Sequence, residues 1–143
     1  KHGINVFRKF HPGGALAKKL LSAGDLMVTP PFILENYKMN KTLKILSEKK
    51  LGLLVVRNKK KFTNGIIVDG DVKRASQKHK NLHDLKVKDI MTKNPLTVNK
   101  DVLAVQCLNL MNKKRITSLL VHNNKKNKTI GVLHIHKVLE NVK

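Results

Sequence analysis

The sequence predicts an α+β fold of two similar units, each running strand, helix, strand, strand, helix, packed about a pseudo-two-fold axis. The main observation is an internal repeat, because three landmarks recur in the same order at offsets of 64 to 66 residues. They are Asp25-Leu26-Met27 and Asp89-Ile90-Met91, Leu53-Leu54-Val55-Val56 and Ser118-Leu119-Leu120-Val121, and Gly65-Ile66-Ile67-Val68 and Gly131-Val132-Leu133-His134. A nearly constant offset indicates a duplicated supersecondary unit. At 143 residues, the chain can bury a core without a disulfide or metal staple.

In the first copy, the prolines of Thr29-Pro30-Pro31 exclude a central strand at that point. Asn40 is a good N-cap for a helix that reaches about residue 50. Residues 51–56 are predicted to form a buried strand, and residues 62–68 to pair back onto it across a polar turn. A second helix is expected to begin at Asp69-Gly70-Asp71.

The second copy repeats this order. Asp101 is expected to begin its first helix, because apolar residues follow at i, i+4 and i+7, namely Ala104, Leu108 and Met111. The other predicted elements are a strand at 96–98, a hairpin of strands at 117–121 and 129–134, and a closing helix at 135–142. Neither copy should be stable alone, because one face of its small sheet must be buried against the other copy.

The repeat divides the chain into residues 1–24, 25–80 and 81–143. The chain begins with Lys1 rather than Met, which suggests a fragment of something longer. Cys107 has no partner for an internal disulfide, and its apolar helical setting predicts a structural core cysteine. No apolar run approaches the roughly 18 residues that span a bilayer, so we expect a cytoplasmic protein without a membrane segment.

The net charge of +21 raises the question of nucleic-acid binding. Arginine supplies only four of the 30 basic residues, although arginine is the side chain that best reads bases and phosphates. Aromatic residues are 3% of the chain, so platforms for stacking single-stranded bases are almost absent. The charge is therefore interpreted as a solvated surface or as an attraction for small phosphorylated ligands, and nucleic acid is an unlikely partner.

The duplicated pattern, with Asp-apolar-Met at the start and Gly-apolar-apolar before an acidic helix start, resembles the cystathionine-β-synthase (CBS) domain. These domains occur in tandem pairs called Bateman modules, and the resemblance covers residues 25–143. The preceding stretch, Phe10-His11-Pro12-Gly13-Gly14-Ala15, followed by Asp25-Leu26-Met27, is similar to the junction in arabinose-5-phosphate isomerases. In that family a sugar isomerase (SIS) domain precedes the CBS pair, so residues 1–24 would be the tail of an SIS domain.

The resemblance implies a parent enzyme that interconverts ribulose 5-phosphate and arabinose 5-phosphate, for 3-deoxy-manno-octulosonate (Kdo) in lipopolysaccharide or capsule. It also implies that His11 belongs to the catalytic site of the intact enzyme. Proton transfer between adjacent carbons needs further acid, base and phosphate-binding groups, which would lie upstream of Lys1. We therefore expect no isomerase activity from the fragment itself, and no cofactor.

The resemblance also implies where a ligand would bind. In ligand-binding CBS domains, a Ser or Thr lies three residues before an Asp at the start of the last helix, and these two side chains hold ribose and phosphate. The first copy keeps Asp71 but has Val68 at the hydroxyl position, which favours a structural role. The second copy has His134 and Lys137, which suit a phosphate or carboxylate ligand. The candidate cleft residues are Val68, Asp71, Thr97, Thr117, Ser118, His134 and Lys137. Thr117 and Ser118 are equally interpreted as exposed strand-edge hydroxyls.

His134 and His136 lie two residues apart and are weak candidates for metal ligands, but no Cys, Asp or Glu lies nearby in the sequence to complete a site. We therefore expect no metal. His79 and His83 flank a polar linker and are expected to be solvated.

Three hypotheses remain open for the function. The first is a regulatory and oligomerisation module that dimerises with another pair and senses a nucleotide, a sugar phosphate or a CMP-sugar. The second is a pure dimerisation scaffold without a ligand, and a basic nucleic-acid-binding module is a third and less favoured alternative.

Overall fold

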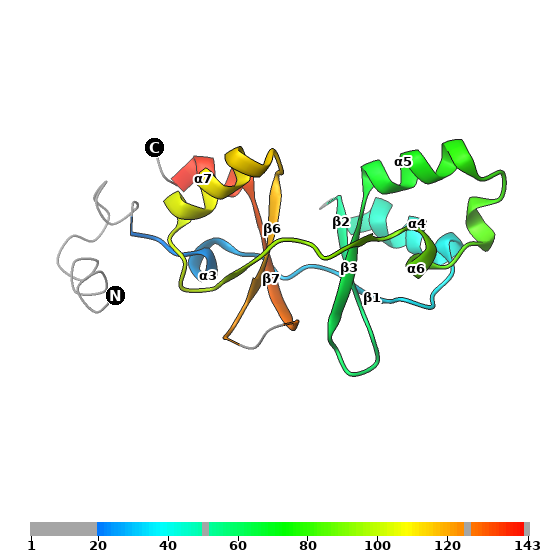
Figure 1. Cartoon of the computed structure of the whole chain (residues 1–143), viewed down its shortest axis with the longest axis horizontal. Coiled ribbons are helices and arrows are strands. Elements are labelled where there is room, and N and C mark those ends of the chain that lie inside the picture. Colours follow the sequence, from blue (N-terminus) through cyan, green and yellow to red (C-terminus); the bar gives the residue numbers. More distant parts are fainter. Residues whose placement is uncertain (1–19, 50–51, 125–126, 142–143) are drawn as a thin grey trace. The chain divides into compact units, whose positions relative to one another are not determined.

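The computed structural model describes residues 20–49, 52–124 and 127–141, and it confirms the predicted α+β class (Figure 1). Its first half contains α3 (Ala23–Leu26), β1 (Phe32–Leu34), α4 (Met39–Lys49), β2 (Leu53–Arg57), β3 (Thr63–Val68) and α5 (Asp69–Lys78). The second half contains a 3-10 turn (Leu82–Asp84), α6 (Val87–Ile90), β4 (Thr92–Lys93), β5 (Thr97–Asn99), α7 (Ala104–Lys114), β6 (Ser118–His122), β7 (Thr129–His134) and α8 (Ile135–Asn141). Both copies thus contain the predicted sequence of strand, helix, strand, strand, helix.

The described residues form two compact units. The β2–β3 unit contains residues 30–95 and 127–129, and the β6–β7 unit contains the described residues within 1–29, 96–126 and 130–143. These divisions follow packing, whereas the sequence boundaries at 24 and 80 follow the repeat. The segment containing His11 lies outside the described residues.

The β2–β3 unit is built on a four-stranded sheet in the order β1-β2-β3-β4. β1 is parallel to β2, and the other neighbours are antiparallel. A helix joins the parallel pair, as a parallel connection requires. The buried core of this unit consists of Ile33, Met39, Leu46, Leu54, Val56, Ile67 and Val87. β2 reads as a continuous apolar run because it lies in the middle of the sheet, and its first four residues are all buried.

The β6–β7 unit has a three-stranded sheet in the order β5-β6-β7, with β5 parallel to β6. Its core includes Ala23, Leu26, Ala104, Cys107, Met111, Leu119, Val121, Leu133 and Val138. Helix α7 begins at Ala104 rather than at Asp101, so the predicted helix start was wrong. The carbonyl of Asn99 accepts from Val102 N, and its side chain accepts from Asp101 N, so these residues form a turn.

The leading segments of the two repeats are exchanged between the units. Residues 25–28 belong to the first repeat, yet they lie in the β6–β7 unit, where Val28 pairs with Val132. The leading segment of the second repeat lies in the β2–β3 unit, where Thr92 and Lys93 form the edge strand β4 beside β3. Each unit is therefore completed by the leading segment of the other repeat.

The Asp-apolar-Met motif has a structural role in this exchange. The carboxylates of Asp25 and Asp89 accept from the backbone nitrogens of Ser22 and Lys86, at 2.9 and 3.0 Å, and so cap the one-turn helices α3 and α6. The methionine that follows each cap then lies over a glycine of the other repeat. The side chain of Met27 occupies the space where Gly131 would carry a Cβ, and that of Met91 lies beside Gly65. The repeated Asp, Met and Gly residues thus make the same arrangement in each unit, in which Asp caps a short helix and Met packs against Gly.

Candidate functional site

Asp71 lies at the start of α5 and is buried, with 5% of its surface exposed. Its Oδ2 accepts from Val68 N at 2.9 Å, which caps the helix. Its Oδ1 accepts from Thr92 Oγ1 and from Arg74 Nη2, both at 2.7 Å. Thr92 belongs to β4, so this carboxylate fastens the exchanged leading segment to the helix. Val68 offers no hydroxyl, and the contacts of Asp71 favour the structural role that the sequence suggested.

The corresponding end of the other unit is basic. β7 ends at His134 and β6 begins at Ser118, and the backbone nitrogen of Ile135 donates to Thr117 O at 2.8 Å. This bond places Thr117 and Ser118 next to the start of α8, where Lys137 is exposed. Thr97 is exposed on the parallel neighbour β5, opposite Leu120 of β6. The structure therefore brings Thr117, Ser118, His134 and Lys137 to one end of the sheet, whereas Thr97 lies opposite the middle of β6.

His134 and His136 contact each other at this end. Their ring centroids are 4.9 Å apart, and His134 Nδ1 accepts from the backbone nitrogen of His136 at 3.2 Å. Partial burial, followed by the positive charge of His136, lowers the pKa of His134 below its ordinary value of 6.5. Within residues 20–49, 52–124 and 127–141, no group of three or more His, Cys, Asp or Glu side chains could hold a metal ion. The two histidines are thus a pair without a third ligand among these residues.

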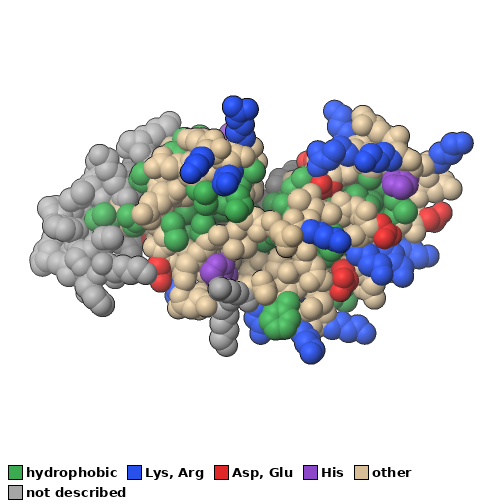
Figure 2. Space-filling view, in the orientation of Figure 1, with side chains coloured by type: hydrophobic (Ala, Val, Ile, Leu, Met, Phe, Trp, Pro, Cys, Tyr) green, Lys and Arg blue, Asp and Glu red, His purple; other side chains and the backbone are tan. Residues whose placement is uncertain are grey.

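Other candidates lie where the sequence suggested. Cys107 is fully buried in α7, and burial raises the pKa of its thiol to about 11, as expected of a core cysteine. His79 and His83 are exposed. Figure 2 shows lysine and arginine side chains dispersed over the visible face rather than gathered in one stripe. None of the helices in the described part of the chain is long and apolar enough to cross a bilayer.

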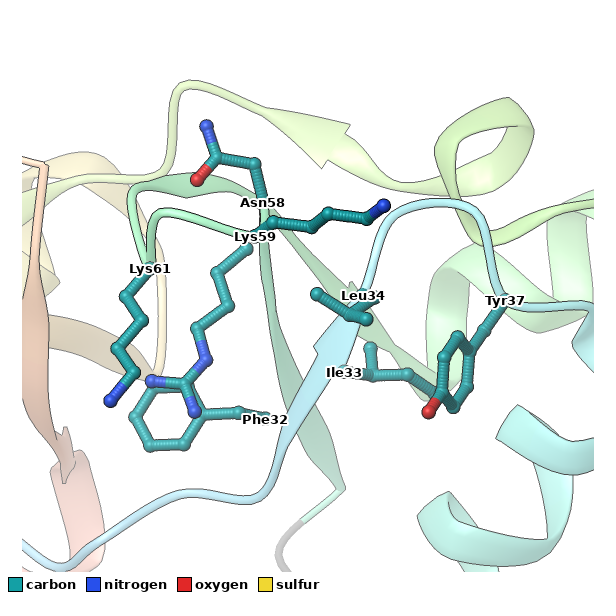
Figure 3. Close-up of a pocket in the computed structure, with 8 residues that line it drawn as sticks. Phe32, Ile33, Leu34, Tyr37, Asn58, Lys59 and Lys61 are labelled. Carbon is teal, nitrogen blue, oxygen red and sulfur yellow. The ribbon is translucent and has the colours of Figure 1, made fainter.

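The structure also contains a pocket that sequence reasoning missed, which we call the hairpin pocket. It lies in the β2–β3 unit between β1 and the β2–β3 turn, has a volume of about 350 Å³, and is partly open to solvent (Figure 3). Its lining includes Phe32, Ile33, Tyr37, Arg57, Lys59 and Lys61. The signal that could have revealed it is the basic turn of the first copy, which follows a strand ending in arginine.

Comparisons with known proteins agree with this architecture. The sequence matches the CBS domain family over residues 23–78 and 87–143. Arabinose 5-phosphate isomerase KdsD of Yersinia pestis is 36% identical over 137 residues, and that of Escherichia coli K12 is 34% identical. Both alignments cover 93% of this chain but only 41% of the relative, so the chain spans about two-fifths of these proteins.

Solved structures have the same fold. The crystal structure of CBSX2 in complex with AMP has a TM-score of 0.71 at 24% identity, covering 84% of this chain and 94% of that one. The CBS pair of MJ0100, in complex with 5'-methylthioadenosine and S-adenosyl-L-methionine, has a TM-score of 0.72 at 20% identity, with coverages of 85% and 94%. At these identities the likeness shows the fold alone. With both repeats matched, the chain belongs to the CBS domain family and consists of a tandem pair.

Proposed function

We propose that this chain is the regulatory CBS pair of an arabinose-5-phosphate isomerase, which supplies arabinose 5-phosphate for Kdo in lipopolysaccharide or capsule. The observation that carries this proposal is the alignment with two KdsD proteins at 34–36% identity over 93% of the chain. The chain spans 41% of those proteins, which fits a module attached to a separate catalytic domain. The His-Pro-Gly-Gly stretch at His11 supports the same parent, whose sugar phosphates would place it in the cytoplasm.

The ligand we propose is an anion, such as an adenosine nucleotide, a sugar phosphate or a CMP-sugar, held at the basic end of the β6–β7 unit. Lys137 and His134 can meet a phosphate there, while the hydroxyls of Thr117 and Ser118 can meet a sugar. The first copy is less suitable, because the Asp71 carboxylate already accepts three hydrogen bonds. Of these two positions only the one in the second copy is therefore expected to hold the ligand, and two pairs would form a dimer with two-fold symmetry.

Thermal unfolding of the chain, titrated with AMP, ATP, CMP-Kdo and arabinose 5-phosphate, tests the ligand. A compound that binds only the folded state raises the midpoint temperature, because the free energy of unfolding increases with the logarithm of one plus the ratio of ligand concentration to Kd. Lys137→Ala should weaken binding about tenfold, as expected for loss of one charge-assisted hydrogen bond, whereas Lys113→Ala, on the exposed end of α7, should not. No response to any of the four compounds would contradict the sensor function.

The isomerase assignment is tested on the longer protein that contains this chain. It should convert ribulose 5-phosphate to arabinose 5-phosphate, and His11→Ala should reduce kcat by about 100-fold or more if His11 transfers a proton. The isolated chain should be inactive. A full-length protein that folds but lacks this activity would contradict the assignment without affecting the titration above.

A dimerisation scaffold without a ligand is the second candidate function. The observation that favours it is Asp71, whose carboxylate is used inside the unit rather than left for a sugar. Light scattering would then report a dimer of the chain whose dissociation constant is the same with and without every compound in the panel. A monomer at high micromolar concentration would contradict this function.

A further inference from the structure

The hairpin pocket lies at the opposite end of the sheet from Asp71. β2 begins at Leu53, which pairs with Val68 beside that carboxylate, and it ends at Arg57, which lines the pocket. The volume of about 350 Å³ is within the range of small-ligand sites. The pocket is therefore separate from the Asp71 end of this sheet.

The charges in the pocket are all of one sign. Arg57, Lys59 and Lys61 line it, and no aspartate or glutamate does. None of the three cations forms an ion pair within the described part of the chain. Three uncompensated positive charges around one hollow attract an anion, because their fields add there.

The arginine of this set is held in a defined orientation. The guanidinium carbon of Arg57 lies 3.9 Å from the centroid of the Phe32 ring, which is a close cation–π contact. Stacking covers one face of the guanidinium but leaves its in-plane N–H groups available, and these are the groups that grip a phosphate in pairs. Figure 3 shows Lys61 extending on the Phe32 side of the turn and Lys59 extending toward the loop that carries Tyr37.

The other wall of the pocket is apolar. Ile33 is buried beneath it, and Tyr37 exposes 43% of its surface. The loop that carries Tyr37 is fixed, because Tyr37 O accepts from Val87 N at 2.8 Å. An exposed aromatic face on a fixed loop offers stacking area at little entropic cost. The pocket thus combines a cationic side with a flat apolar side.

The backbone of the turn holds Lys61 in place. Asn58 Oδ1 accepts from the backbone nitrogens of Lys60 and Phe62, and Asn58 O accepts from Lys61 N at 2.9 Å. Lys61 has φ of 70°, a left-handed conformation that favours glycine or asparagine. The second copy has Asn127 at this place in its turn, with φ of 69°. A lysine here is less favourable for the turn than glycine or asparagine, so the turn itself does not account for it.

The second copy shows that the fold does not require these residues. The registers Phe32 with Val55 and Thr97 with Leu120 make Thr97 the counterpart of Phe32. In the same way, the registers at the other end of these strands make His122 the counterpart of Arg57. The same strand pairing therefore forms in the second copy without an arginine stacked on an aromatic ring. These pocket residues are not required for the strands to pair.

We propose that the hairpin pocket binds a small phosphorylated ligand with a flat aromatic body. The phosphate lies between Arg57 and Lys61, and the ring lies against Tyr37. This site is independent of the proposed sensor site at Lys137 and of the isomerase assignment.

Phenyl phosphate is the probe, and amide chemical shifts of the ¹⁵N-labelled full chain are the measurement. Saturable shifts are expected at Tyr37 and at residues 57–62, and binding should weaken as salt is raised. Phenol should bind at least tenfold more weakly than phenyl phosphate, and so should inorganic phosphate. Shifts confined to other parts of the chain, or equal binding of inorganic phosphate, would overturn the proposal.

Variants distinguish the site from general attraction by a basic protein. Arg57→Gln should weaken phenyl phosphate binding about tenfold, and Lys61→Asn about fivefold, since it inserts the residue of the second copy and keeps the turn. Lys44→Gln, on the exposed face of α4, removes the same charge and should leave the dissociation constant within twofold. Lys137→Ala should also leave it unchanged. If Lys44→Gln weakens binding as much as Lys61→Asn does, the proposal is wrong.

Discussion

Gly65→Ala is expected to destabilise the β2–β3 unit by about 2 kcal/mol, within the range of overpacked sites. Gly65 is buried in β3 and pairs with Lys93 of β4. A Cβ at this position would lie 2.5 Å from the carbonyl oxygen of Thr92 and 3.1 Å from Met91 Sδ. Met91 can rotate away, but the carbonyl is backbone, so β4 must move by about 0.9 Å to restore an ordinary contact of 3.4 Å.

This displacement has a further effect, because Thr92 also donates to the buried carboxylate of Asp71. Moving β4 stretches that hydrogen bond, and a weakened bond to a buried charged group adds to the loss. In urea unfolding the free energy should fall by about 2 kcal/mol, and the midpoint temperature by about 7 °C for a chain of this size. The m-value should be unchanged, since the surface exposed on unfolding is the same.

Gly70→Ala is the matched control. Gly70 lies in the first turn of α5, and a Cβ there would meet only the flexible guanidinium of Arg74, at 3.1 Å. Alanine is the better helix former, so this variant should be as stable as the original chain or more stable by up to about 1 kcal/mol. If Gly65→Ala unfolds within 0.5 kcal/mol of the original chain, the packing of β4 on Gly65 is not the constraint described above.

Three further predictions follow from the contacts and pKa shifts. Since the folded-state pKa of His134 lies below that of the unfolded chain, unfolding becomes easier as pH falls below about 6.5. The free energy of unfolding, measured in urea at pH 7.5 and at pH 5.0, should fall less between these pH values in His134→Gln than in the original chain. Cys107, with its pKa raised to about 11, should react with a thiol reagent at pH 8 far more slowly than in urea, and equal rates would contradict its burial. Asp71→Asn should lower the free energy of unfolding by about 1–3 kcal/mol. A double-mutant cycle with Thr92→Val should give a coupling energy above about 0.5 kcal/mol, and additive effects would contradict the hydrogen bond between the two side chains.

The order of the elements could be predicted because its signals are local. Apolar runs such as 53–56 and 118–121 lie between polar turns, and their repetition identifies the pair of copies without any knowledge of packing. The start of α7 was predicted three residues early, because Asp101 resembles a helix cap but lies in a turn made by Asn99. The helices α3 and α6 were missed, since four residues are too few to show a helical period.

The exchange of leading segments could not be predicted, because both segments begin with the same Asp-apolar-Met motif. Each copy has both a methionine and a glycine of this kind, so the sequence does not indicate which glycine Met27 or Met91 covers. The hydrogen bond between Thr92 and Asp71 could not be predicted either, because it joins two different repeats. Thr92 lies 21 residues away from Asp71 and belongs to the next repeat.

Comparing equivalent positions of the two copies identifies residues that the fold requires in both and positions that can differ. The residues retained in both copies, Asp25 and Asp89, Met27 and Met91, and Gly65 and Gly131, all act in the exchanged packing.

Among the positions that differ are charged and polar residues at the two ends of the sheets. At one end, His134 and Lys137 replace Val68 and Asp71, and at the other Arg57 stands where the second copy has His122. The two copies therefore share their packing residues and differ at the ends where we propose binding, and a ligand should bind one copy in preference to the other at each end.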